Sequence, residues 1–212
     1  MSADMLVLAA LCIPLLIAAG IAAAGRFPNV REGVTVVGSV ILLGVVIALA
    51  LSVARGNAPA LDLGAAAPGL SFAFKLEPLG ALFALVASGL WIVNSFYSIG
   101  YMRGNRERNQ TRFYICFAIA IFGALGVAMS GNLFTLFVFY EVLTLSTYPL
   151  VAHKGDAAAK RGARIYLLTL LGTSIGLFLT ALMWTWTLAG QNLDFVQGGL
   201  LSGLNISPAV ST

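Results

Sequence analysis

Charged side chains are scarce in this sequence: only 9% of its 212 residues are Asp, Glu, Lys or Arg. An ordinary soluble domain carries about 25% charged residues, whereas here 59% of the residues are hydrophobic. This composition excludes an ordinary soluble protein. Histidine occurs once and cysteine twice, which excludes a disulfide framework or a metal site built from these residue types.

Six stretches are long and apolar enough to cross a bilayer, since a spanning helix needs about 20 mostly apolar residues. They are residues 5–25, 33–54, 79–102, 113–129, 133–152 and 165–189. The first could be a secretory signal, but its leading segment MSADM has an acid and no base, and its apolar part is too long. We therefore predict an all-α integral membrane protein, with a bundle of about six transmembrane helices forming one domain over residues 1–190.

Two segments outside these spans have patterns of their own. Residues 56–77 are rich in Gly, Pro and Ala, and within them the apolar residues of LSFAFKL (70–76) alternate with small or polar ones. This alternation is typical of a strand, so we predict a short hairpin on the outer surface. Residues 191–212 contain Gly-Gly and Ser-Gly breakers and no further span. We expect them to form an outer-side tail, in the amino-terminal part of a larger protein.

The basic residues divide unequally between the two sides of the predicted bundle. Arg55 and Lys75 follow the second span, and the other ten of the twelve lie in or beside the first, third and fifth connections. These ten are Arg26, Arg31, Arg103, Arg106, Arg108, Arg112, Lys154, Lys160, Arg161 and Arg164. Because short cytoplasmic loops are enriched in Lys and Arg, we predict a multi-pass protein of the inner (cytoplasmic) membrane with its N-terminus outside. Topology thus accounts for the net charge of +4 without a nucleic-acid partner.

Glu141 is the only acidic or basic side chain between residues 133 and 152. At 1.5 Å per residue it lies about 12 Å from either end of its helix, where an acid costs about 2.5–3.5 kcal/mol. Two interpretations explain its presence. A protonated carboxyl group could hold two helices together through a hydrogen bond, or the carboxyl group could be a relay that takes up and releases protons.

The residues after Glu141 favour the relay. Thr144 and Tyr148 follow at i+3 and i+7, so their hydroxyl groups share one helix face with the carboxyl group and could carry protons or hold water. Pro149 deprives a carbonyl of the preceding turn of its amide partner. His153, at the helix exit, titrates near neutrality; it either passes protons to the cytoplasm or is a solvated loop histidine. We predict a hydrated half-channel from Glu141 toward the cytoplasm.

The sixth span supplies a candidate partner. A stripe at helical spacing contains small residues that allow close helix packing; its members are Arg164, Leu168, Thr169, Gly172, Thr173 and Gly176. Arg164 lies roughly 10 Å shallower in the membrane than Glu141, so we do not expect a direct salt bridge. It is either a modulator of the charge on Glu141 or an arginine whose head reaches the interface.

Two segments carry a family resemblance: residues 70–102, which end in SIGYM, and residues 132–179, which begin NLFTLFVFYEVLTLSTYP. They resemble the antiporter-like proton-translocating subunits of respiratory complex I, membrane-bound hydrogenases and Mrp cation/proton antiporters. The resemblance implies that Glu141 belongs to the charged axis along which protons move. Arg164 stands where that family commonly has lysine; arginine cannot be deprotonated, so it could bias Glu141 but not relay a proton. The family's conducting lysine and second repeat would follow Thr212.

The resemblance implies a proton-conducting subunit of a multisubunit complex, with coupling to Na⁺ or K⁺ left open. Its partners would be other membrane subunits of an antiporter or respiratory complex, and the lipid bilayer. The alternative is a non-conducting structural or assembly subunit. The sequence offers no ligand set for flavin, haem or iron–sulfur clusters, so we expect no cofactor and no catalytic site in this chain. The complex itself could be a proton-pumping NADH:quinone oxidoreductase or a hydrogenase-type enzyme.

Overall fold

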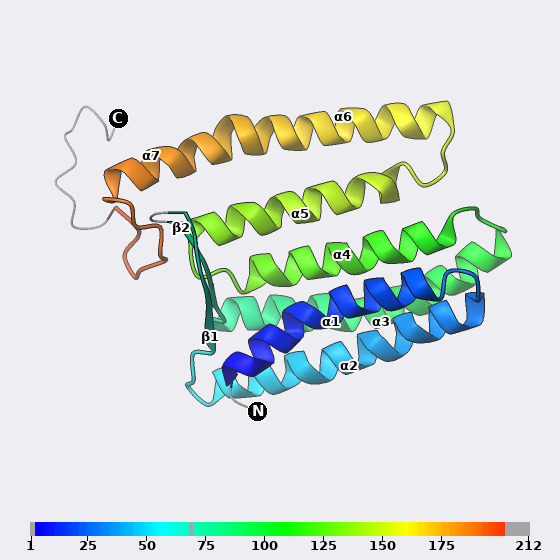
Figure 1. Ribbon diagram of the computed structural model, residues 1–212, viewed down its shortest axis with the longest axis horizontal. Coiled ribbons are helices and arrows are strands. Elements are labelled where there is room, and N and C mark those ends of the chain that lie inside the picture. Colours follow the sequence, from blue (N-terminus) through cyan, green and yellow to red (C-terminus); the bar gives the residue numbers. More distant parts are fainter. Residues whose placement is uncertain (1–2, 68–69, 202–212) are drawn as a thin grey trace.

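A computed structural model describes residues 3–67 and 70–201. Its long helices run roughly side by side, and a β-hairpin lies at one end of them (Figure 1). The helical elements are α1 (Ala3–Ala23), α2 (Pro28–Ala54), α3 (Pro78–Gly104), α4 (Gln110–Ala128), α5 (Leu133–Val151), α6 (Ala157–Thr173), η1 (Ser174–Leu179) and α7 (Thr180–Leu188). The last three form one run, and six helical runs in all are long and apolar enough to span a membrane. The predicted class, a six-helix membrane bundle, is confirmed.

Helices α2 and α6 begin at least five residues earlier than their apolar stretches indicated. α2 starts at Pro28, because proline is tolerated in a first helical turn, where its missing N–H would have no helical partner. α6 starts at Ala157, and the Asp156 carboxylate accepts a hydrogen bond from the Ala159 amide at 2.6 Å, which caps the helix. Charged residues follow within both helix starts, Arg31 and Glu32 in α2 and Lys160 and Arg161 in α6, so hydropathy alone left these turns out.

The two ends of the bundle differ in charge. The α1–α2, α3–α4 and α5–α6 connections lie together at one end (Figure 1), which carries or adjoins ten of the twelve basic residues; we call it the basic end. The opposite, hairpin end holds β1 (Ala60–Ala67) and β2 (Leu70–Lys75), which pair antiparallel. The predicted strand hairpin is therefore confirmed.

The hairpin fixes the start of α5, the helix that carries Glu141. The Asn132 side chain caps α5 by accepting from the Thr135 amide at 2.7 Å, and it donates to the Ser71 carbonyl at 2.9 Å. The Thr135 hydroxyl in turn accepts from the Ala73 amide at 3.1 Å. Asn132 and Thr135 are both buried, and their part-buried hydrogen bonds tie the first turn of α5 to β2.

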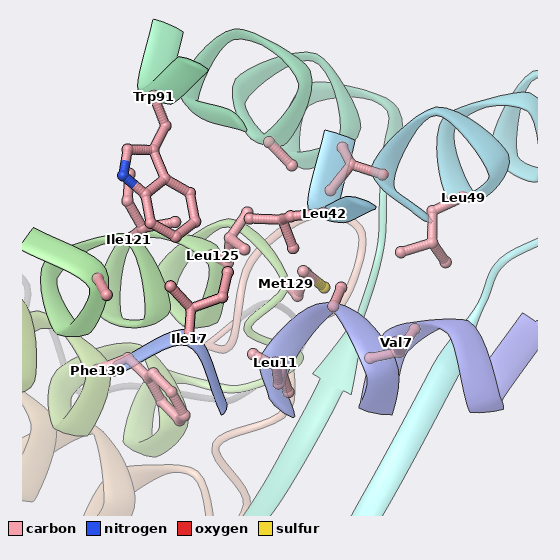
Figure 2. Packing of buried hydrophobic residues seen from close by; sticks show 14 of the residues in the cluster. Val7, Leu11, Ile17, Leu42, Leu49, Trp91, Ile121, Leu125, Met129 and Phe139 are labelled. Carbon is pink, nitrogen blue, oxygen red and sulfur yellow. The ribbon is translucent and has the colours of Figure 1, made fainter. Parts of the chain in front are cut away.

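The apolar core lies among α1–α5, with Trp91, Leu125 and Phe139 among its members (Figure 2). Helices α4 and α5 approach closely because α4 presents glycine to its neighbour: a Cβ atom at Gly126 would fall 1.8 Å from the Phe139 ring. The α6–α7 run packs mainly on α5 and leaves most of its surface exposed. The core therefore holds α5 from one side only.

Part of the predicted tail packs against the hairpin end. The Leu133 amide donates to the Leu193 carbonyl at 3.0 Å, Phe195 donates to the Gly131 carbonyl at 3.0 Å, and Leu193 is buried. Residues up to 201 contain no further helix within the described part of the chain. The remainder of that prediction, residues 202–212, lies outside the described residues.

Gly80 is the glycine whose replacement tests the helix packing most cleanly. A Cβ atom there would lie 2.1 Å from the Ala128 carbonyl oxygen, whereas a Cβ at Gly89, in the same helix, meets nothing within 4 Å. We expect Gly80→Ala to destabilise the protein by about 1–3 kcal/mol through overpacking. Gly89→Ala should be neutral or stabilising by up to about 1 kcal/mol. Thermal unfolding in detergent measures both, and equal midpoints would contradict the packing of α3 on the end of α4.

Candidate functional site

Glu141 lies near the middle of α5, as expected from the sequence. Its side chain is half-buried, and its Oε1 atom is buried without a hydrogen-bond partner among the described residues. No ion pair joins it to Arg164 or to any other described residue. The structural interpretation of Glu141 needs a hydrogen bond to another helix, and the Oε1 atom makes none within the described chain.

Hydroxyl groups continue from Glu141 toward the basic end. Thr144 is buried, and one turn further the Thr147 hydroxyl lies 3.0 Å from the Tyr166 hydroxyl of α6. Thr147 also donates to the Thr144 carbonyl at 2.8 Å. Thr147 and Tyr166 therefore link α5 to α6 on the side of Glu141 nearer the basic end.

A cavity of about 650 Å³ opens at the basic end between α4, α5 and α6. Tyr148 and Pro149 line it from α5, and Arg164 lines it from α6. The structure thus brings together two predicted site residues, Tyr148 and Arg164, at one polar cavity. Glu141 and Thr144 are not part of its lining, and Glu141 lies seven residues, about 10 Å, deeper than Tyr148.

Arg164 is exposed and does not contact Glu141. Thr147 of α5 contacts Tyr166 of α6, so these two residues lie at the same level. Glu141 lies six residues from Thr147 away from the basic end, and Arg164 lies two residues from Tyr166 toward it. At 1.5 Å per residue the two levels differ by about 12 Å along the bundle. The absence of a direct salt bridge between Arg164 and Glu141 within the described chain agrees with the sequence expectation.

The stripe predicted on the sixth span does not pack against the described chain. Gly172 and Gly176 are exposed, and a Cβ atom at either would meet nothing within 4 Å. The close-packing interpretation of this stripe is wrong for contacts within the described chain. The sequence could not show this, because α6 is apolar on more than one face and the stripe could lie on any of them.

A π-helical turn, η1, interrupts the α6–α7 run at the depth of Glu141 and was not predicted from the sequence. Phe178 lies against Phe137 and Tyr140 of α5, with ring centroids 5.4 and 6.1 Å apart, while Tyr166 meets Thr147. The two helices are antiparallel. Glu141 lies between the aromatic contact and the Thr147–Tyr166 contact on α5, and Ser174 lies between the same two contacts on the α6–α7 run. Ser174 is buried and begins the π turn, a feature that occurs frequently at functional sites.

His153 lies just beyond α5 against the α3–α4 connection. Its Nε2 atom is 3.9 Å from a Glu107 carboxylate oxygen, and its ring stacks edge-on against Phe113 at 5.3 Å. Burial holds the pKa of His153 below the usual 6.5; Glu107 acts to raise the pKa and Arg112 to lower it. His153 is therefore not a solvated loop histidine, because both ring nitrogens are buried and make no hydrogen bond with the described residues.

The sequence analysis missed a buried charged cluster at the basic end. Arg31 and Glu32, in the first turn of α2, are only 4% and 5% exposed. Arg103 of α3 forms an ion pair with Glu32 and also donates from Nε to it at 3.1 Å. Arg31 donates to Gln110 at 2.8 Å and to Thr111 at 3.1 Å, both in α4. The cluster ties α2, α3 and α4 together, and hydropathy had placed its residues in a loop.

The fold and this polar site define a class, a multi-pass membrane protein with an acid inside its helical bundle. Residues 66–114 match the family model described as NADH-ubiquinone oxidoreductase (complex I), chain 5 N-terminus. The chain is similar to NADH-quinone oxidoreductase subunit N of Desulforudis audaxviator, at 31% identity over 71% of this chain and 30% of the relative. It is also similar to Na⁺/H⁺ antiporter subunit A1 of Staphylococcus aureus, at 36% identity over 40% of this chain and 10% of the relative.

A solved structure shares the fold: a chain of the membrane-bound sulfane sulfur reductase, an archaeal respiratory membrane complex. Its TM-score is 0.73 at 20% identity, over 88% of this chain and 28% of that one. The chain is thus similar to antiporter-like membrane subunits of complex I and multisubunit antiporters, which confirms the resemblance. It spans less than a third of the length of these relatives. Both named relatives are described as subunits.

The charged cluster predicts a large loss of stability when Glu32 is removed. Glu32→Ala leaves Arg31 buried without its carboxylate, which should cost about 3–5 kcal/mol. The matched control is Glu77→Ala, because Glu77 pairs with Lys75 at 3.0 Å but both side chains are exposed, and such pairs contribute about 0–1 kcal/mol. Thermal unfolding of the two variants compares them. Similar midpoints would show that the buried cluster does not stabilise the α2–α3–α4 contact.

His153 is the only histidine, so its titration can be followed directly by NMR in labelled protein. We expect half-protonation below pH 6.5, since burial lowers the pKa. The unfolded chain then binds this proton at a higher pH than the folded one, so the stability contribution is lost as pH falls below about 6.5. Glu107→Gln should lower the pKa further and Arg112→Gln should raise it. A His153 pKa above 6.5 in the wild-type chain would contradict its buried placement.

Proposed function

We infer that this chain forms the amino-terminal part of a proton-translocating, antiporter-like subunit, in which Glu141 takes up and releases protons. The observation that carries the inference is the Oε1 atom of Glu141, buried at mid-helix and unpartnered among the described residues. An ionised carboxylate left without a partner costs several kcal/mol in an apolar setting. A proton, a water molecule or a cation that reaches this carboxylate therefore stabilises it. A proton relay requires a group that binds a proton in this way.

The arrangement around Glu141 supports a path toward the basic end. Thr144 and Tyr148 follow on the same helix face, and Tyr148 borders the cavity of about 650 Å³. Glu141 and Tyr148 are separated by about 10 Å along the helix. Water must therefore enter the space between them for protons to pass from one to the other. The π turn that begins at Ser174 lies at the same depth, and such turns occur frequently at functional sites.

Arg164 and His153 have secondary roles in this proposal. Arg164 lines the cavity that Tyr148 borders and sets its potential without exchanging protons, because its guanidinium group stays charged. His153 borders a neighbouring cavity of about 440 Å³ together with Glu107. Its lowered pKa keeps it neutral near pH 7, so it can accept a proton only transiently.

The distribution of basic residues supports an orientation. Ten of twelve Lys and Arg residues belong to the basic end, so by the positive-inside rule this end faces the cytoplasm and the N-terminus lies outside the inner membrane. Protons would then exchange between Glu141 and the cytoplasm through the cavity at Tyr148. The named relatives include an Na⁺/H⁺ antiporter subunit, which makes Na⁺ a candidate coupled ion and K⁺ a second one.

Replacing Glu141 in the complete complex tests the relay. In vesicles, Glu141→Gln should reduce formation of a pH gradient at least about tenfold, since proton transfer by a positioned group is worth about 10²–10⁴-fold. Glu141→Asp should retain part of the activity, because it keeps a titratable group one methylene shorter. Glu77→Gln is the control, an exposed acid at the hairpin end. Wild-type gradients from the Glu141→Gln complex would instead support a non-conducting structural subunit.

A further inference from the structure

The cavity between α4, α5 and α6 has an unusual charge balance. Three basic residues line the cavity: Arg112 from the first turn of α4, and Lys160 and Arg164 from α6. Lys160 and Arg164 are four residues apart and therefore share one helix face. Among the described residues that line the cavity, none is acidic. Three like charges meet there without a counter-charge in the wall.

Asp156 and Glu107, which are close in sequence to residues of the cavity wall, make contacts of their own. The Asp156 carboxylate caps the start of α6 at 2.6 Å from the Ala159 amide, and Glu107 faces His153 at 3.9 Å in the neighbouring cavity. None of the three basic side chains forms an ion pair or a hydrogen bond with any residue that the structure describes. Because like charges that converge repel one another, the cavity favours an anion from outside the described chain.

The size and position of the cavity indicate which kind of anion. A volume of about 650 Å³ is far more than one phosphate group needs and falls within the usual range for organic ligands. The cavity lies where α4 begins and α5 ends, which is the headgroup level of a spanning bundle. Below it, the apolar side chains of Leu145 on α5 and Leu168 on α6 are 52% and 72% exposed. A lipid tail could lie along both of these side chains.

We propose that this cavity binds the phosphate group of an anionic phospholipid, with Arg112, Lys160 and Arg164 contacting the headgroup and Leu145 and Leu168 contacting the acyl chains. Basic pockets between helices at the cytoplasmic side bind such headgroups. Arginine suits this role because its planar donors match phosphate oxygens in pairs, and Tyr148 adds a hydroxyl at the inner wall. The site shares Tyr148 and Arg164 with the proposed proton path, but lipid binding does not depend on transport.

Native mass spectrometry on the complete, delipidated complex tests the site directly. The complex is titrated in detergent with phosphatidylglycerol, with phosphatidylcholine and with inorganic phosphate. We expect phosphatidylglycerol to bind more tightly than the other two. Changing Arg112, Lys160 and Arg164 to Gln together should weaken its binding at least about tenfold, since each basic residue near the surface contributes to lipid attraction.

The control removes the same charge from the neighbouring cavity. Arg106, Arg108 and Lys154 line that cavity together with Glu107, and changing all three to Gln should alter phosphatidylglycerol binding by no more than about threefold. Replacing Arg112 and Arg164 by Lys keeps the charge and should retain most of the phosphatidylglycerol binding. This variant distinguishes the loss of charge at the site from misfolding of the protein. Equal losses in both Gln triples, or unchanged binding in the first, would overturn the proposal.

Two further outcomes separate the possible ligands. Inorganic phosphate that competes as well as phosphatidylglycerol would assign the cavity to a free anion and overturn the lipid proposal. Equal binding of phosphatidylcholine would show that headgroup charge plays no part, which overturns it as well. Because the readout is bound lipid, a complex with inactive Glu141→Gln should still bind phosphatidylglycerol normally, so the two proposals can fail separately.

Discussion

An uncompensated carboxyl group inside a helical bundle is the constraint on which this account depends. Apolar surroundings disfavour an ionised carboxylate unless a proton, a cation or water compensates it. Glu141 lies at mid-helix with one buried, unpartnered oxygen among the described residues. Arg164 is too far along the bundle to compensate the charge, and Thr144 and Tyr148 place hydroxyl groups on the same helix face as Glu141. These neighbours support the proposal that Glu141 exchanges a proton.

The rest of the fold positions this group. Asn132 and Thr135 are buried and attach the start of α5 to the hairpin through hydrogen bonds, and the glycines of α4 allow α4 and α5 to pack closely. At the other end the Arg31–Glu32–Arg103 cluster joins α2 and α3, and Arg31 extends the link to α4. Helix α5 is therefore fixed on its α4 side, while its α6 side is joined by fewer contacts, among them a pair of hydroxyls and a few aromatic rings. The weaker side is the one where the π turn and the cavity lie.

The sequence predicted the features that depend on local composition and missed those that depend on distant partners. Long apolar runs identified the six helices, and strand alternation identified the hairpin, because both patterns are confined to one segment. Glu32 escaped notice because its partner Arg103 is 71 residues away and its own turn is polar. The face that α6 turns toward α5 was also out of reach, because Tyr166 and Phe178 are no more apolar than the exposed Leu168. The π turn at Ser174–Leu179 has an ordinary helical sequence, SIGLFL.

The central claim is that the Glu141 carboxyl group changes its protonation state during transport. Infrared difference spectroscopy on the complete complex observes this directly, since the C=O stretch of a protonated carboxyl group disappears when the proton leaves. The account predicts a carboxyl band that changes when a pH gradient is applied, shifts for Glu141→Asp and is absent for Glu141→Gln. A difference spectrum that is identical in wild type and Glu141→Gln would contradict it.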